Sequence, residues 1–223
     1  LGLVIENDPE GSTGGRPPAQ LMLNSSAGVV LAADFEVDRC RLALSTLDGS
    51  SLGEMQADVD IGLGPEVVVD WMVEHFVDLL GNVGRGVPDV VGIGIGLPGP
   101  VEFRLGRVVS PPIMSGWDGV SIPELVWRTF PVPVQVDNDV NIMAVGEHAA
   151  YWHDLVDDLL FVKVSAGIGC GIIAGGRLHR GAQGAAGDVG HIPVDGYPDV
   201  ICRCGNPSCV EAAASGAAIA ARL

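Results

Sequence analysis

The sequence predicts an α/β protein folded as two lobes. Its 223 residues suffice for one large domain or two small lobes, and 48% hydrophobic residues with 32 glycines are typical of an α/β chain with many tight turns. Strand-like apolar runs are followed by segments of helical periodicity. After an acidic stretch at 153–158 this pattern starts again, which predicts a second lobe that begins like the first.

The first lobe is expected to begin with three strands, the last two of which form a hairpin, followed by a helix. Alternating residues over 29–34 and 41–47 predict two strands, and Asp48-Gly49 predicts the turn onto a third. Gly64-Pro65 predicts a helix start, because proline fits the first helical turn, and Gly81 predicts its end. The buried face of that helix is expected to be its apolar stripe, formed by Val68, Trp71, Met72, Phe76, Leu79 and Leu80.

A functional segment is expected where the next strands end. The run 88–95 predicts a buried strand that leads into Gly96-Leu97-Pro98-Gly99. After a helix expected over 122–130, the run 132–136 predicts a further strand. Asp137-Asn138-Asp139 follows at the carboxyl end of that strand, before a helix expected over 140–152. Ligands of open α/β sheets gather at such strand ends, so this tripeptide predicts a binding site.

The second lobe is expected to open with two strands, 159–164 and 171–174, joined by the glycine-rich loop 165–170. From Val210 onward the alanine-rich sequence predicts helix.

One imidazole and three thiols near the C-terminus predict a structural zinc site. A closed tetrahedral site uses such a ligand set, and four protein ligands leave no position for a reactive water. The alternative is a group of isolated buried thiols, but a Cys-x-Cys pair beside a third cysteine and a glycine turn favours metal. Cys40 and Cys170 are expected to be small packing residues rather than a disulfide pair. The predicted zinc ligands are His191, Cys202, Cys204 and Cys209.

Composition argues against several classes of protein. The formal charge of −16 argues against this chain gripping a phosphate backbone, which requires clustered lysine and arginine. No apolar run approaches the ~18 residues of a membrane helix, so a soluble chain without a membrane partner is expected. A thiolate metal site without a secretion signal points to a reducing cytoplasm. Because the sequence begins in mid-motif without methionine, we expect an excised part of a longer protein.

Four motifs in a fixed order resemble the ROK family of repressors, open reading frames and sugar kinases, within the actin-like, Hsp70-like sugar-kinase (ASKHA) fold. The resemblance runs from Gly28 to the end of the chain, with the second lobe incomplete. Any single glycine motif is weak evidence, whereas this order ending in the cysteine cluster is highly specific. The motifs are Gly96-Leu97-Pro98-Gly99-Pro100-Val101, Asn138-Asp139-Val140-Asn141, Gly167-Ile168-Gly169-Cys170-Gly171 and Gly187-Asp188-Val189-Gly190-His191.

The resemblance implies a sugar site. Asp139 corresponds to the carboxylate that acts as general base on a sugar hydroxyl in the kinases, and a helix N-cap is its alternative or additional role. His191 would contact the sugar while it binds zinc through its other ring nitrogen. Asp188 stands where the kinases commonly have glutamate, which could alter the hydroxyl that is reached. The positions implied to hold the sugar are Gly99, Asn138, Asp139, Asp188, His191 and Glu211.

Both phosphate loops depart from the kinase pattern. The kinases carry Asp-x-Gly-Gly-Thr-Lys after the first strand, where this chain has Asp34-Phe35-Glu36-Val37-Asp38-Arg39. The branched Val37 obstructs a tight turn, and Glu36 and Asp38 would repel phosphates. Ala166 stands where the second loop usually has threonine. ATP and magnesium are therefore expected only if the chain is a kinase with remodelled loops. The nucleotide-binding positions that the family implies are Asp34, Gly167, Gly169 and Gly171.

The N-terminal segment resembles the end of a winged helix-turn-helix domain. Residues 3–6, Gly14-Gly15-Arg16-Pro17 and 21–24 resemble the β-ribbon wing that precedes the sugar-sensing domain in ROK repressors. The alternative is an ordinary flexible extension. The expected organisation is a wing remnant and linker over 1–27, the first lobe over 28–156, and the start of the second lobe with the zinc motif over 157–223.

These features together predict the effector domain of a ROK-family transcriptional regulator, in the first instance a repressor. It would bind a sugar or sugar phosphate in a zinc-braced pocket, and operator DNA would be bound by a domain absent from this chain. A homodimer or homotetramer is expected. The alternative is an ATP-dependent hexose or N-acylhexosamine kinase of the glucokinase type, with Asp139 catalytic. A scaffold that binds neither ligand is a third interpretation.

Overall fold

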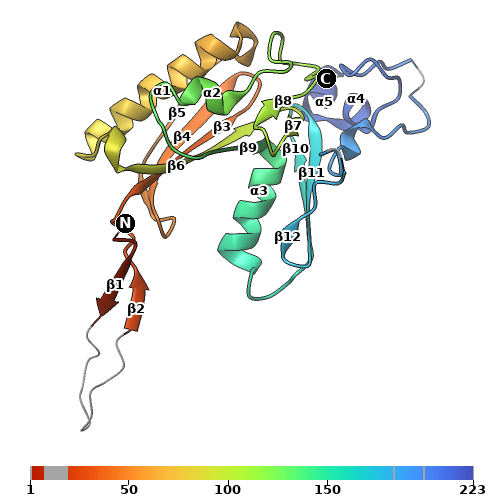
Figure 1. Cartoon of the computed structure of the whole chain (residues 1–223). Helices are drawn as coiled ribbons and strands as arrows, with labels where there is room; N and C mark the ends of the chain where they lie inside the picture. The colour runs from red at the N-terminus through yellow and green to blue at the C-terminus, as the bar shows by residue number, and fades with distance from the viewer. Residues whose placement is uncertain (1, 8–19, 183, 198, 223) are drawn as a thin grey trace.

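The computed structural model describes residues 2–7, 20–182, 184–197 and 199–222. Its strands fall into a five-stranded sheet, a three-stranded sheet and two short ribbons (Figure 1). The strands are β1 (Val4–Asn7), β2 (Gln20–Leu23), β3 (Val29–Phe35), β4 (Arg39–Thr46), β5 (Ser51–Asp58), β6 (Val90–Leu97), β7 (Val101–Glu102), β8 (Arg107–Val108), β9 (Val134–Asn138), β10 (Leu159–Val164), β11 (Ile168–Ala174) and β12 (Arg177–Leu178). The α-helices are α1 (Pro65–Asn82), α2 (Ile122–Val126), α3 (Asp139–Glu147), α4 (Val210–Ala214) and α5 (Gly216–Ala220).

The five-stranded sheet has the order β5-β4-β3-β6-β9 and mixes both kinds of pairing. The β4–β5 hairpin is antiparallel, as predicted from Asp48-Gly49, and β3 also pairs antiparallel with β4, while β6 runs parallel to both β3 and β9. The carboxyl ends of β3, β6 and β9 therefore meet at one edge, which is where Asp34, Leu97 and Asn138 lie. This edge is the position at which a ligand was expected.

Helix α1 buries its predicted stripe in the main hydrophobic core. Val68, Met72 and Phe76 are fully buried together with Leu31 and Leu44 of the sheet. Trp71 was expected on the same face but is only partly buried at its margin. The helix ends at Asn82, one residue beyond the expected glycine, because an isolated glycine costs a helix only about 1 kcal/mol.

Several predicted boundaries were wrong near the site. Strand β9 was expected over 132–136 but covers Val134–Asn138, so the polar tripeptide forms the last strand residues and the first residue of α3. Strand β11 begins at Ile168, so half of the expected loop 165–170 is strand, and only 165–167 turn the hairpin. Helix α2 covers Ile122–Val126 and stops short of residue 130.

Helix α3 connects the two sheets. It contacts β6 and β9 of the larger sheet and β10 and β11 of the smaller sheet, and Figure 1 shows it between them. It ends at Glu147 and continues as one π-helical turn, His148–Trp152, before the acidic stretch. The N-terminus of α3 is therefore held where both sheets can contribute side chains.

The N-terminal strands β1 and β2 pair as an antiparallel ribbon that projects from the body (Figure 1). Both strands are exposed, including Leu21 and Met22. The expected Gly14-Gly15-Arg16-Pro17 run lies outside the described residues. Among the helices that the structure describes, none is both long and apolar enough to cross a lipid bilayer.

Candidate functional site

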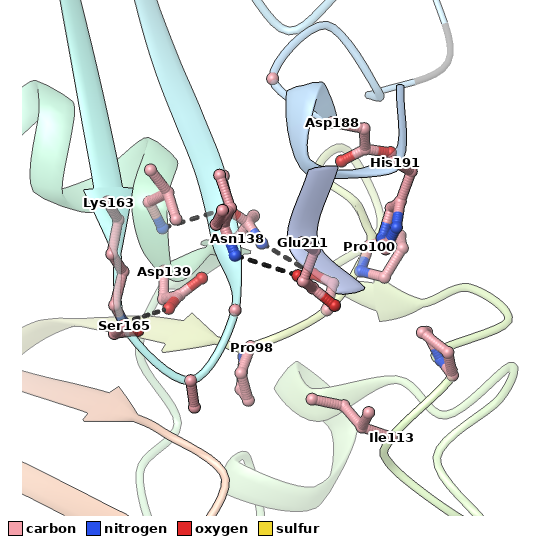
Figure 2. Close-up of a pocket in the computed structure, with 18 of the residues that line it drawn as sticks. Pro98, Pro100, Ile113, Asn138, Asp139, Lys163, Ser165, Asp188, His191 and Glu211 are labelled. Atoms are coloured by element: carbon pink, nitrogen blue, oxygen red, sulfur yellow. Dashed lines mark hydrogen bonds and ion pairs between the residues drawn. The ribbon is translucent and has the colours of Figure 1, made fainter. Parts of the chain in front are cut away.

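A cavity of about 360 Å³ lies where the two sheets meet around the start of α3. Its walls come from the turn after β3, the segment after β6, the β10–β11 hairpin and the cysteine-rich C-terminal segment. Figure 2 shows Asn138, Asp139, Asp188 and Glu211 directed into this space. All the sugar positions that the resemblance implied line this one cavity: Gly99, Asn138, Asp139, Asp188, His191 and Glu211.

Asn138 is the N-cap of α3. Its Oδ1 accepts hydrogen bonds from the backbone amides of Val140 at 3.0 Å and Asn141 at 3.4 Å. Its Nδ2 donates to the Gly99 carbonyl oxygen at 3.3 Å, which joins α3 to the segment after β6. The alternative that Asp139 caps this helix is therefore wrong, and the Asp139 carboxylate is available for other contacts.

Asp139 forms a buried ion pair that the sequence interpretation missed. Its side chain is 7% exposed, and its Oδ2 accepts a hydrogen bond from Lys163 Nζ at 2.8 Å (Figure 2). Burial raises the pKa of Asp139, and the charge and hydrogen bond of Lys163 oppose that rise. Two signals in the sequence could have revealed this partner. Lys163 is the only lysine in the chain, and it occupies an inward position of the alternating strand β10.

Asp137 is not among the residues that line the cavity, and its contacts fix the wall behind them. Its Oδ2 accepts from Arg180 Nε at 2.8 Å and pairs with Nη2 at 2.7 Å, while its Oδ1 accepts from Asn141 Nδ2 at 2.9 Å. The Arg180 guanidinium also lies 3.6 Å from the ring centroid of Phe103. This arginine follows β12, so the contact joins the smaller sheet to the end of β9.

The predicted zinc ligands converge on one point. One ligand atom from each of His191, Cys202, Cys204 and Cys209 lies within 4.8 Å of all the others. Cys204 Sγ is 3.7 Å from Cys209 Sγ, and Cys202 Sγ is 3.7 Å from His191 Nδ1. A tetrahedron with Zn–S bonds of about 2.3 Å has edges of about 3.8 Å, so this donor set fits zinc.

The metal-type cluster adjoins the cavity. His191 and Cys204 belong to both, and Glu211 Oε1 lies 3.8 Å from Cys202 Sγ. With Nδ1 facing Cys202, the Nε2 edge of His191 is the one that remains for a ligand. Burial raises the pKa of Asp188, and the nearby His191 opposes that rise.

The turn that replaces the first phosphate loop presents carboxylates to the cavity. Glu36 and Asp38 line it with Val37. The turn is closed by a hydrogen bond from the Glu36 amide to the Arg39 carbonyl at 2.8 Å, and the Val37 carbonyl accepts from Ile61 at 3.1 Å. Like charges at this position disfavour a polyphosphate.

Asp34 lies beneath this turn and is not among the residues that line the cavity. Burial raises its pKa, and the charge of Asp139 raises it further. Among the residues that the structure describes, no hydrogen-bond partner reaches its buried Oδ1.

At the three glycines expected to bind a nucleotide, packing in this fold leaves little room for a side chain. A Cβ at Gly171 would lie 2.4 Å from Ala144 Cβ, and one at Gly169 would lie 3.1 Å from Val140 Cγ2, both on α3. A Cβ at Gly167 would lie 2.8 Å from Glu211 Oε2, and that same oxygen accepts from the Ile168 amide at 3.0 Å. One amide of the second loop is thus already bonded to a protein carboxylate.

The remaining cysteines behave as expected from the sequence. Cys40 and Cys170 are buried and free, and burial raises the pKa of both thiols. Neither joins the metal-type cluster.

Two sheets bridged by a helix over a polar cavity define a protein of the actin-like sugar-kinase fold. Solved structures agree with this assignment. A ROK family transcriptional regulator, a homolog of the E. coli MLC protein, superposes with a TM-score of 0.81 at 26% identity over 99% of this chain and 55% of its own. A ROK family glucokinase from Streptomyces griseus, in complex with glucose and AMPPNP, gives a TM-score of 0.75 at 28% identity over 86% of this chain and 59% of its own.

The chain belongs to the ROK family. The sequence profile of that family matches residues 31–223. A curated relative, the xylose repressor of Caldicellulosiruptor bescii, is 34% identical over 218 residues, which cover 98% of this chain and 54% of the repressor. The chain thus spans about half the length of the curated repressors it matches. Both the family and the fold expected from the ordered motifs are confirmed.

Proposed function

We propose that this chain is the sugar-sensing part of a ROK-family transcriptional repressor. The proposal rests on one cavity in which one side offers hydrogen-bond acceptors for a sugar and another side carries negative charge. Asp139, Asp188 and Glu211 offer the acceptors that sugar hydroxyls require, while Glu36 and Asp38 offer negative charge where a nucleotide's phosphates would enter. A site with this composition favours a neutral sugar without ATP.

The similarity to repressors supports the same conclusion. The xylose repressor matches nearly the whole chain, including the segment before residue 31 that contains the exposed ribbon of β1 and β2. In the proposed whole protein, a winged helix-turn-helix domain preceding this ribbon binds operator DNA. The charge of −16 agrees with a body that does not itself grip DNA.

We also propose that the His-Cys cluster holds one structural zinc ion. The ion would bind His191, Cys202, Cys204 and Cys209, and it would fix the imidazole edge that faces the cavity. The proposal is supported by the two 3.7 Å ligand-to-ligand separations. Zinc would thereby brace one wall of the sugar pocket.

Calorimetric titration with D-xylose and with D-glucose tests the proposed function. We expect saturable binding of at least one of these sugars, unchanged by magnesium and AMPPNP, and no sugar phosphorylation with ATP. Asp139→Asn should weaken binding by about tenfold to a hundredfold, the range for a hydrogen bond to a charged group. Asp70→Asn, at an exposed position of α1, is the matched control and should bind as the unmodified chain does.

A sugar kinase is the second candidate, favoured by the similarity to the glucokinase and by one feature of Asp139. Burial raises the pKa of Asp139, as suits a general base. Glucose-dependent ATP consumption at kinase-like rates, lost in Asp139→Asn, would replace the regulator proposal with this one. Absence of sugar binding under all these conditions would leave the scaffold interpretation.

A further inference from the structure

The only lysine of the chain lies at the floor of the cavity. Lys163 occupies an inward position of β10, between neighbours whose side chains face outward, and its side chain is 16% exposed. A long, strongly hydrated cation is rarely placed in such a position without a partner. Its surroundings therefore need an explanation that neither the fold nor the family motifs supply.

Three carboxylates from three elements surround this ammonium group. Lys163 Nζ lies 2.8 Å from Asp139 Oδ2 at the start of α3 and 3.8 Å from Glu36 Oε1 in the turn after β3. Asp34, at the end of β3, also acts on it through its charge. Lys163 is the cation that this group shares, because it contacts both Asp139 and Glu36 and its charge also lowers the pKa of Asp34.

We propose that Lys163 is a built-in cation that holds Asp139 ionised and oriented toward the sugar, in place of any divalent ion. Asp139 lines the cavity, and an ionised carboxylate is the better acceptor for a sugar hydroxyl. The pair needs no nucleotide and no metal to be complete. The assignment of Asp139 as a sugar contact rests on the proposed function, whereas the ion pair itself can be tested without any sugar.

The charges of both partners agree with this role. Burial alone would lower the pKa of Lys163, but the charge and hydrogen bond of Asp139, with Glu36 and Asp34, raise it overall. Lys163 therefore remains an ammonium throughout the neutral range. Burial and the charge of Glu36 raise the pKa of Asp139, and the charge and hydrogen bond of Lys163 oppose them first, with a smaller effect from the Val140 amide. Without Lys163, Asp139 would take up a proton more readily.

The absence of any other lysine permits a direct experiment. Selective ¹⁵N labelling of lysine gives one side-chain Nζ resonance from this chain. In the unmodified protein we expect a protected ammonium signal that deprotonates at a higher pH than the same signal in Asp139→Asn. An Nζ signal with the exchange rate and titration of a free lysine, unchanged by Asp139→Asn, would overturn the proposal.

Variants at Lys163 test its role in the pocket. Lys163→Met should weaken D-xylose or D-glucose binding at least tenfold at pH 7 and make it strongly pH-dependent between pH 5 and 8, while Lys163→Arg should restore most of the affinity. Lys163→Met should also gain Mn²⁺ affinity by at least tenfold, because three carboxylates lose their cation. Arg85→Met, which removes an exposed ion pair with Asp89, is the matched control and should change neither property.

The outcomes separate the two proposals. If the unmodified chain binds neither sugar but its Nζ resonance behaves as expected, the proposed function fails and the built-in cation stands. If a sugar binds and Lys163→Met keeps the same affinity, pH profile and Mn²⁺ response, the built-in cation fails and the proposed function stands. If Lys163→Met does not fold, the pH titration of the Lys163 Nζ resonance in the unmodified chain and in Asp139→Asn still tests the built-in cation.

Discussion

The substitution Gly171→Ala tests why the glycine motif of the second hairpin exists. The added methyl would lie 2.4 Å from Ala144 Cβ and 2.8 Å from the Val140 carbonyl oxygen. Optimal carbon–carbon contact is about 3.5–4.0 Å, so α3 would have to move by about 1 Å or more. Such overpacking costs about 1–3 kcal/mol, offset by about 0.5–1 kcal/mol from the lower entropy of the unfolded chain. We expect a net loss of about 1–2 kcal/mol.

Urea unfolding followed by circular dichroism measures this loss. Gly94→Ala is the matched control, because Gly94 also lies in a strand but a Cβ there meets nothing within 4 Å. The double variant Ala144→Gly with Gly171→Ala removes the closer of the two contacts. It should recover about 0.5–1 kcal/mol beyond the sum of the single changes, as expected for residues in direct contact.

Equal stability of Gly171→Ala and Gly94→Ala would refute the packing argument. So would strict additivity in the double variant. In either case the glycine would have to be explained by the approach of a ligand, which is the role that the sequence motif implied.

Three further results are expected. Cys204→Ser should lose about one equivalent of zinc by elemental analysis and lower Tm by about 10 °C, since metal binding is coupled to folding; a chain without metal when freshly purified and reduced would contradict this. Ser208 has φ +62°, so Ser208→Val should destabilise by about 1–3 kcal/mol in thermal unfolding, whereas Ser208→Gly should stay within about 1 kcal/mol of the unmodified chain. Because the pKa of Lys163 is raised in the folded chain, its ion pair stabilises the fold fully below the ordinary lysine pKa of about 10.4. That stabilisation is lost as the pH rises through the pKa of the folded state. The urea midpoint should therefore fall less between pH 8 and 11.5 in Lys163→Met than in the unmodified chain.

The sequence was sufficient for the parts of the fold set by local pattern. The strands β3 and β4, the β4–β5 hairpin, the start of α1 and the span of β10 follow from alternation and from glycine and proline positions. The boundaries failed where tertiary contacts decide. Strand β11 extends back to Ile168 because β10 pairs with it along its whole length, although its glycines suggested a loop.

The motifs were sufficient to predict which residues lie at the site. The residues implied for the sugar and the metal lie together, but their partners do not follow from any local pattern. Lys163 and Arg180 reach Asp139 and Asp137 across 24 and 43 positions of sequence, respectively. Charge partners at such separations depend on how two sheets pack, which periodicity does not specify.

Asp137 and Asp139, at the junction of β9 and α3, have different roles at the site. Asp137 lies in β9 and Asp139 is the first residue of α3, and each carboxylate is held by one cation from the side of the smaller sheet. The Asp137–Arg180 pair lies outside the cavity lining and fixes the wall, whereas Asp139 and Lys163 both line the cavity. A sugar that contacts Asp139, as proposed above, would act directly on one of the ionic links to the smaller sheet. Because a ligand can shift a conformational equilibrium only through contacts that differ between states, this link is where binding would change how the sheets are held together.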